Sequence, residues 1–364
     1  MKSVTSQIRR FRRTFLFLTA IAPICPALPA PPARAAAPKV AFVYVSPVGD
    51  AGWTYQHDQG RRALEQALAM QATVVEGVAE GPDAERVMRD LARQGHQLIF
   101  ATSFGYLEPA LRVAVEFPQV RFEHAGGYKT APNLNTYNAR FYEGRYLAGL
   151  LAGRSSKSGV AGYVAGFPVP EVVQGINAFT LGMQAANPRA LVKVIWLNAW
   201  YDPPREREAA LTLISQGADV LTNHSGSPAV PQAAEEKGVK LIAYTSDMAR
   251  FAPHAQLAAV THHWGAYYVQ RARAIQDGSW SPQPVWGGLK DGMVQLSALS
   301  STVPKETRAL IEKRRQDIIA GRFAPFAGPL VDANGQERLA KGVLSDEAIA
   351  TMNWFVRGVQ GGAR

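Results

Sequence analysis

The chain has 364 residues, with 39 Lys and Arg against 29 Asp and Glu and a formal net charge of +10 at pH 7. Residues 1–36 hold six of the basic side chains and none of the acidic ones, so residues 37–364 carry a net charge of only +4. That small charge excludes a broad basic surface for nucleic acid, and the length favours two domains.

The first residues have the three parts of an export signal. An apolar run from Phe15 to Ile24 is too short for a permanent membrane anchor, which takes about 20 residues. Ala33-Arg34-Ala35 then offers a cleavage site of the A-x-A type. We therefore expect residues 1–36 to be removed and the mature protein to be periplasmic. The basic residues ahead of the apolar run are Lys2, Arg9, Arg10, Arg12 and Arg13.

Two details of this signal bear on the export route. Arg12-Arg13-Thr14-Phe15-Leu16 resembles a twin-arginine motif, although an ordinary signal rich in arginine is the favoured interpretation. Cys25 is the one cysteine of the chain, and it lacks the small preceding residue that a lipoprotein acceptor needs. The mature chain is thus expected to be neither a lipoprotein nor a user of disulfide or thiolate chemistry.

The next hundred residues alternate between β-branched or aromatic runs and amphipathic runs, which is typical of strands followed by helices. Pro82 near the start and Gly95 just past the end of one helical run have the expected asymmetry. This alternation predicts a parallel sheet covered on both faces. The predicted strands are 39–46, 72–76, 97–102, 120–124 and 134–138, and the predicted helices are 54–70, 83–94 and 106–117.

The rest of the chain repeats this plan and ends in a less regular tail. The predicted strands are 159–165, 191–197, 219–222, 240–244 and 257–262, and the predicted helices are 142–154, 171–186, 204–216, 228–237, 265–277, 304–320 and 346–357. No long linker separates the two halves, and segments near 137–141 and 260–264 are typical of extended crossovers.

We therefore expect an α/β fold in which two Rossmann-like lobes with parallel sheets are joined by crossover strands. The first lobe would take residues 37–139 plus 264–298, and the second 140–263 plus 299–364. Crossovers of this kind form a hinge, with a cleft between the opposed strand ends.

Aromatic and polar side chains recur in the loops after the predicted strands, where open α/β sheets bind ligands. Rings can stack on a flat heteroaromatic ligand while polar groups contact its edge. A single Trp at a strand end more often packs on the core, and Asp247 serves equally well as a cap. The candidate ligand-binding residues are Asp50, Trp53, Tyr55, Ser103, Phe104, Phe167, Trp200, Asn223, His224, Asp247, His262 and Trp264.

A serine hydrolase is a weaker alternative. Ser103 lies in an A-x-S-x-G segment, and Asp247 and His262 follow in the chain order of α/β-hydrolases. The segment lacks the first glycine of a nucleophile elbow, and no oxyanion segment precedes it. No metal site is expected either, because adjacent residues such as His262 and His263 point to opposite faces of a strand. The absence of a phosphate-binding glycine loop after any strand argues against a nucleotide cofactor.

Five segments resemble the basic membrane protein family, which comprises substrate-binding proteins of ATP-driven importers and includes a purine-nucleoside receptor type. They occur in the family's order and span almost the whole mature chain. The segments are KVAFVYVSPVGDAGWTYQHDQGRRALE (39–65), LIFATSFGY (98–106), YNARFYEGRYLAGLLAG (137–153), NAWYDPPREREAA (198–210) and YTSDMARF (244–251).

The resemblance implies a periplasmic-binding-protein type I fold that closes on a purine base or nucleoside and docks on an inner-membrane permease. By position, Trp53 and Trp200 would stack on the two faces of the ligand. Asp50 and Asn223 would contact its edges, and Asp247 would be a further polar contact. A monomer is expected, with no cofactor. A receptor that hands its bound state to a membrane sensor would use the same cleft.

The sequence departs from the nucleoside-binding pattern at two places. Thr222-Asn223-His224-Ser225 replaces a glycine-rich segment, and His262-His263-Trp264 replaces a segment that carries a lysine. Bulkier side chains there should shrink the space for a sugar. The interpretation is therefore a free nucleobase such as adenine, or a similar small heterocycle.

Overall fold

The computed structural model describes Ser3 and residues 38–362. The expected export signal, its cleavage site, the twin-arginine motif and Cys25 lie outside the described residues. From residue 38 onward the described chain belongs to one compact unit, which contains both lobes. No helix among the described residues is long and apolar enough to cross a membrane.

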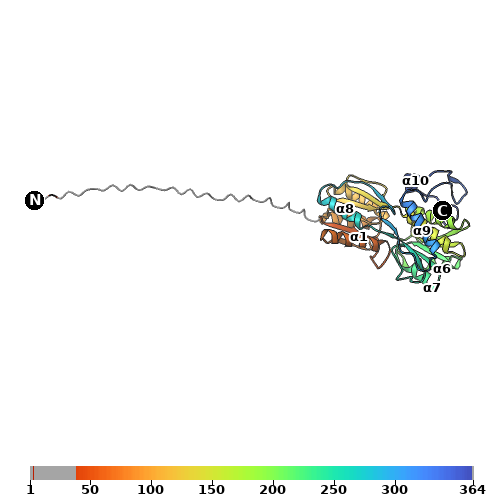
Figure 1. The fold of residues 1–364 in the computed structure, drawn as a ribbon. Coiled ribbons are helices and arrows are strands. Elements are labelled where there is room, and N and C mark those ends of the chain that lie inside the picture. The colour runs from red at the N-terminus through yellow and green to blue at the C-terminus, as the bar shows by residue number, and fades with distance from the viewer. Residues whose placement is uncertain (1–2, 4–37, 363–364) are drawn as a thin grey trace. The chain divides into compact units, whose positions relative to one another are not determined.

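The first lobe is built on a six-stranded, wholly parallel sheet in the order β11-β5-β4-β3-β1-β2. Helices α1 and α8 pack side by side on one face (Figure 1). Helices α2 and α3 cover the other face. The strands are β1 (Val40–Val43), β2 (Thr73–Val75), β3 (Leu98–Ala101), β4 (Arg121–Ala125), β5 (Leu134–Ala139) and β11 (Val285–Gly287); the helices are α1 (Trp53–Leu68), α2 (Pro82–Arg93), α3 (Leu107–Glu116) and α8 (Gly265–Gln276).

The sequence of β1 explains why this strand lies inside the sheet. All four of its residues are apolar and buried. Val40 and Phe42 pack under α1 and α8, whereas Ala41 and Val43 pack under α2 and α3. A strand that is buried on both faces needs such a continuous apolar run, rather than the alternation of a strand with one wet face.

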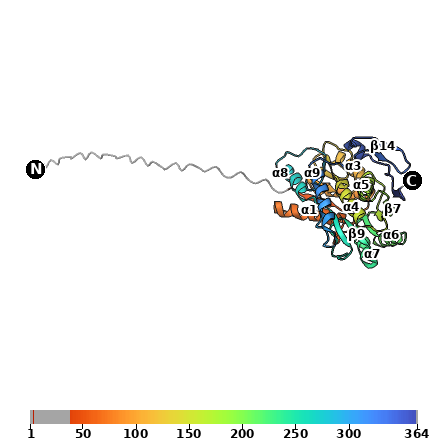
Figure 2. The ribbon, with the colours of Figure 1, turned by 45° about the vertical axis from the view of Figure 1, so that its right-hand side comes forward.

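The second lobe has a seven-stranded sheet in the order β12-β10-β9-β8-β6-β7-β15, parallel except for β12. Helices α4 and α5 cover one face and α6 and α7 the other, while α9 packs against α4 (Figure 2). The strands are β6 (Val160–Ala165), β7 (Leu191–Trp196), β8 (Val220–His224), β9 (Lys240–Thr245), β10 (Gln256–His262), β12 (Val294–Leu296) and β15 (Val359–Gln360); the helices are α4 (Phe141–Ser155), α5 (Pro170–Ala186), α6 (Pro203–Ser215), α7 (Ala229–Lys237) and α9 (Lys305–Ile319).

The chain crosses between the sheets three times. It leaves the first lobe after β5, returns after β10, and leaves again between β11 and β12. The two expected crossovers therefore exist, and the α/β class with two parallel-sheet lobes is confirmed. The third crossover was not predicted. It places β12 in the second sheet, although the sequence-based division at residue 298 assigned this segment to the first lobe.

The tail differs most from the prediction. The helix expected over 346–357 is confined to α10 (Asp346–Ala350), and the chain then extends into β15. Tertiary hydrogen bonds explain the difference, because the Asn177 amide of α5 donates to the Trp354 carbonyl and accepts from the Val356 amide. A short hairpin of β13 (Leu330–Val331) and β14 (Glu337–Leu339) precedes α10.

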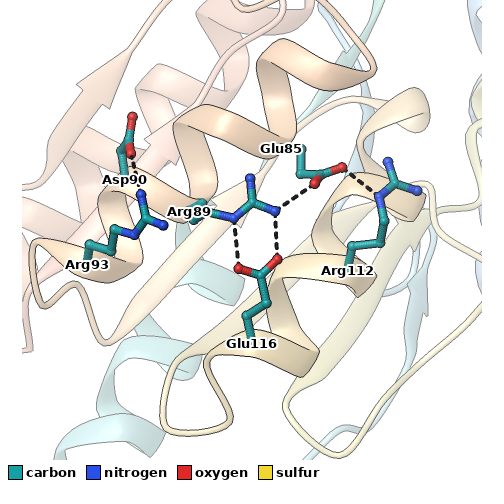
Figure 3. Close-up of polar contacts among 6 residues, drawn as sticks. All are labelled: Glu85, Arg89, Asp90, Arg93, Arg112 and Glu116. Carbon is teal, nitrogen blue, oxygen red and sulfur yellow. Dashed lines mark hydrogen bonds and ion pairs between the residues drawn. The ribbon is translucent and has the colours of Figure 1, made fainter.

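An ion-pair network links α2 to α3 on the outer surface of the first lobe (Figure 3). Arg89 of α2 lies 2.6 Å from both Glu85 and Glu116, and Arg112 of α3 lies 2.6 Å from Glu85. These groups are partly exposed to solvent, so the network adds less to stability than the apolar contacts beneath it.

Candidate ligand-binding site

A cavity lies between the lobes, where strands of both sheets reach their carboxyl ends. With its mouth, it holds about 460 Å³ of empty space. The first lobe contributes Val45, Ser46, Trp53, Ser103 and Phe104, and the second contributes Glu171, Trp200, His224, Ser225, Gly226 and Thr245.

The lobes touch each other around this cavity. The Gly52 amide donates to Ser246 Oγ at 2.9 Å, and Gln56 Nε2 donates to the Thr245 carbonyl at 3.0 Å. Thr245 itself has a φ of 66°, which is costly for a β-branched residue and is found mainly where function holds it in place. The two lobes are therefore in direct contact beside the cavity.

Trp53 forms part of the first-lobe wall. Its Nε1 donates to the Thr102 carbonyl at 2.7 Å, which fixes the indole against β3. The centroid of the ring also lies 4.5 Å from that of His57 and 5.9 Å from that of Trp264, and both pairs are arranged edge-to-face. The indole is thus held by both a hydrogen bond and aromatic packing, and it meets the cavity in one orientation.

Trp200 forms part of the opposite wall, in the loop between β7 and α6. A Cβ on Gly166 would lie 2.7 Å from the Trp200 ring, so only glycine leaves room for it there. The Phe167 ring packs on it at 4.9 Å. Trp200 Nε1 donates across the cleft to Glu80 at 3.2 Å.

Glu80 organises the first-lobe edge of the site. Its Oε1 accepts from Ser103 Oγ at 2.6 Å and from the Gly105 amide at 2.8 Å, in addition to Trp200. The sequence reasoning missed this residue, although it lies in the loop that follows β2. The sequence could have indicated Glu80, because ligands of open α/β sheets bind at the loops that follow the strands, and the loop after β2 is one of these.

Two polar groups of the second lobe face the cavity with unused hydrogen-bonding capacity. His224 is 5% exposed, and its Nδ1 has no partner among the described residues. Burial lowers the pKa of His224 well below its usual value, so the ring is neutral. Glu171, in the first turn of α5, accepts one hydrogen bond from Asn138 at 3.3 Å. Burial raises the pKa of Glu171 to about 7.

Comparison with known proteins agrees with this geometry. The family model for PnrA-like ABC transporter substrate-binding proteins matches residues 37–324. The chain belongs to this family. A purine-binding protein of Brucella abortus is 49% identical over 324 residues, which cover 88% of this chain and 92% of that protein. The family resemblance is thus confirmed, and the chain is a substrate-binding protein rather than an enzyme.

Two other matches extend the comparison. A putative ABC transporter glucose-binding protein of Haloferax volcanii is 38% identical, over 88% of this chain and 80% of its own length. A solute-binding protein of an ABC transporter from Conexibacter woesei superposes with a TM-score of 0.65 at 24% identity, over 79% of this chain and 98% of that one. The latter likeness concerns the fold, which is of the periplasmic-binding-protein type I.

Five of the twelve candidate residues of this substrate-binding protein line the cavity, namely Trp53, Ser103, Phe104, Trp200 and His224. Of the others, Asp50 is exposed and lies 3.0 Å from Arg250 of the second lobe. Asp247 is exposed and accepts from the Ala249 amide at 2.9 Å, as a turn cap does. Tyr55 is half-buried on α1, and Phe167 packs behind Trp200.

The remaining three candidates are buried behind the lining. Asn223 donates to the Ser225 carbonyl at 3.1 Å. His262 stacks on Phe141 at 4.3 Å, and Trp264 stacks on His57 at 5.0 Å. They support the cavity wall rather than forming its surface.

The hydrolase alternative is wrong. Ser103 Oγ donates to Glu80, and Asp247 accepts from Ala249 and Gln256. Neither ring nitrogen of His262 has a hydrogen-bond partner among the described residues. The three residues therefore form no triad. No group of three or more His, Cys, Asp or Glu side chains in the described part of the chain is arranged to hold a metal ion.

Proposed function

We propose that this protein captures a purine nucleobase of the adenine type in the periplasm and delivers it to an inner-membrane ABC permease. The observation that carries the proposal is the cavity between two sets of strand ends, with a large aromatic side chain from each lobe. Trp53 comes from the first lobe and Trp200 from the second. The 49% identity to a purine-binding protein supports the same ligand class.

The lining suits a flat heterocycle. Trp53, Phe104 and Trp200 offer ring faces, and hydroxyl groups and one imidazole offer hydrogen bonds to a polar edge. His224 lines the cavity within the segment that is glycine-rich in nucleoside binders, which favours a base over a nucleoside. The polar lining residues are Ser46, Ser103, Glu171, His224, Ser225 and Thr245.

Capture would proceed by hinge closure. A ligand held by both lobes binds the closed form more tightly than the open one, and so shifts the population toward closure. Burying the faces of a purine between aromatic rings contributes on the order of several kcal/mol, at ~25 cal/mol per Å² of apolar area. The closed surface of the monomer would then dock on the permease; a membrane sensor is the alternative recipient.

The test is to identify what the protein binds. Purified mature protein would be denatured and the released small molecules identified by mass spectrometry. Calorimetric titrations would follow with adenine, hypoxanthine, adenosine, inosine and glucose. We expect recovery of a free base and tightest binding by a base. Tighter binding of nucleosides than of every base would contradict the nucleobase assignment, and binding of glucose alone would contradict the purine assignment.

A further inference from the structure

The carboxyl group of Glu171 lies where the two lobes meet. Glu171 belongs to the second lobe, yet its Oε2 accepts from Asn138 of β5 in the first lobe. The same oxygen would lie 3.1 Å from a Cβ on Gly126, at the end of β4, so the absence of that side chain leaves it room. Glu171 is therefore positioned to contact a ligand enclosed by both lobes.

This carboxyl group is buried with little compensation. Glu171 is 8% exposed, and among the described residues its single hydrogen-bond donor is Asn138, at a long 3.3 Å and on one oxygen. No Lys or Arg of the described chain forms an ion pair with it. A buried carboxyl group normally has partners for both oxygens, so Glu171 has capacity for a ligand.

A second buried group of the same cavity points to a ligand independently. His224 Nδ1 is buried and has no hydrogen-bond partner among residues 38–362. Glu171 and His224 both line the cavity and both come from the second lobe. Two polar groups with unused hydrogen-bonding capacity therefore lie in one largely apolar cavity. Together they can bind the hydrogen-bond donors and acceptors of a ligand.

We propose that Glu171, in its neutral form, reads the ligand's polar edge by accepting from an N–H and donating its O–H to the adjacent acceptor. A neutral carboxyl group presents one acceptor and one donor side by side, whereas a carboxylate only accepts. The matching edge is that of a 6-aminopurine, in which an amino group stands beside a ring nitrogen. This inference rests on the proposed purine function and adds the residue that selects the ligand and makes capture pH-dependent.

The surroundings of Glu171 favour the neutral form. Burial raises its pKa to about 7, and the nearby Glu80 carboxylate acts in the same direction. Burial keeps His224 and Tyr244 uncharged, since the pKa of the first is lowered and that of the second is raised. Glu347 of α10 borders the neighbouring groove that also contains Glu171. Glu171 would therefore lose its proton near neutral pH.

The test compares wild type with Glu171→Gln and Glu171→Leu by calorimetric titration of adenine and of N6,N6-dimethyladenine, from about pH 6 to about pH 8.5. Wild-type affinity for adenine should fall with rising pH, by up to about tenfold per unit once the pH exceeds the pKa of Glu171 in the ligand-free protein, which is about 7. Glu171→Gln keeps one donor and one acceptor at every pH, so its affinity should stay flat. Glu171→Leu should bind adenine about 10- to 100-fold more weakly, as expected for a lost buried hydrogen-bonding partner.

The dimethylated base serves as the matched control ligand, because it lacks the amino N–H. Wild type should prefer adenine over it, and Glu171→Leu should lose most of that preference. The thermal unfolding of each ligand-free variant checks its fold. If wild type binds adenine while Glu171→Leu keeps full affinity, or if Glu171→Gln keeps the wild-type pH profile, the role of Glu171 is refuted and the purine function stands. If wild type binds no purine, both fall.

Discussion

The indole of Trp200 is half-buried, packs on Gly166 and Phe167, and reaches the first lobe through its bond to Glu80. Trp200→Ala should therefore weaken purine binding by about 10- to 100-fold, the usual effect of losing one aromatic face from a base. Apo stability should change little, since the ring lies in a loop at the cavity rather than in the core. Calorimetric titration and thermal unfolding measure the two effects.

Trp196→Ala is the matched control. Trp196 is also half-buried in the second lobe, but its Nε1 donates to the Gly361 carbonyl at 2.9 Å and its ring packs on Phe355, away from the cavity lining. This variant should keep ligand affinity while losing stability. The opposite pattern, with Trp200→Ala unfolding at a much lower temperature, would place Trp200 in the structural core.

Alanine substitutions at two glycines of one loop distinguish the effect of backbone strain on ligand binding from the effect of contact between the lobes. Gly49 and Gly52 have φ angles of 56° and 98°, so an alanine at either position is strained, by about 1–2 kcal/mol. A Cβ on Gly49 would meet nothing within 4 Å, whereas a Cβ on Gly52 would lie 2.1 Å from the Gly226 carbonyl oxygen of the other lobe. Gly52→Ala should thus block full closure and weaken ligand binding by at least about tenfold.

Gly49→Ala should lower stability in a similar way but leave the dissociation constant within about twofold of wild type, which titration calorimetry can resolve. Equal losses of affinity in both variants would mean that loop strain, and not contact between the lobes, controls binding. Small-angle scattering with ligand would reveal whether Gly52→Ala remains more open than wild type.

At the scale of elements, α4 and α5 approach so closely that backbone meets backbone. A Cβ on Gly149 would lie 1.9 Å from the Phe179 carbonyl oxygen, and one on Gly182 would lie 2.1 Å from that of Tyr146. Helix propensity alone predicts that Gly149→Ala stabilises the protein by up to about 1 kcal/mol. We expect instead a loss of at least about 2 kcal/mol, because the two buried helices must separate. Urea unfolding gives the sign, and a gain in stability would refute the close packing.

Most helices and strands could be predicted because their hydrophobic period is long and regular. The helix predicted over 171–186 is observed as Pro170–Ala186, and the strand over 191–197 as Leu191–Trp196. The short strands β11 and β12 were not predicted, because each is defined by pairing with a strand far away in the sequence, β5 and β10 respectively. The helix predicted in the tail was too long for another reason. Hydrogen bonds between the Asn177 side chain and the backbone of Trp354 and Val356 outweigh the local helix preference.

The site was harder to predict than the fold. The rule that ligands bind at strand ends found the correct loops, but it does not tell which side chain of a loop turns inward. After β1, Trp53 at the start of α1 lines the cavity, while Asp50 in the loop is exposed and pairs with Arg250. After β6, Phe167 was predicted to contact the ligand, yet Glu171 is the residue that lines the cavity. Such choices depend on contacts between the lobes, which no local pattern encodes.

At the scale of the whole molecule, buried histidines link stability to pH. His57, His124, His224 and His262 are at most 5% exposed. Burial lowers the pKa of His124 to about 3 and those of the other three well below the usual value. Each remains neutral in the folded protein at pH values where the unfolded chain binds a proton. Their contribution to stability is therefore full above about pH 6.5 and is lost as the pH falls.

Buried carboxyl groups act in the opposite direction. Burial raises the pKa values of Glu143, Glu171 and Glu206, so the folded protein takes up protons there before the unfolded chain does. This stabilises the fold on acidification, for Glu171 from about pH 7 downward. The four histidines outnumber these three carboxyl groups, so acidification from pH 7.5 to pH 5 should destabilise the protein.

The free energy of unfolding should therefore be lower at pH 5 than at pH 7.5, by on the order of 1.4 kcal/mol for each net proton and each pH unit. Urea unfolding followed by tryptophan fluorescence measures it. Glu171→Gln removes one of the opposing carboxyl groups, so its loss of stability between pH 7.5 and pH 5 should be larger than that of wild type. If wild type were more stable at pH 5, the buried carboxyl groups would dominate, and the four histidines would have to be protonated in the fold.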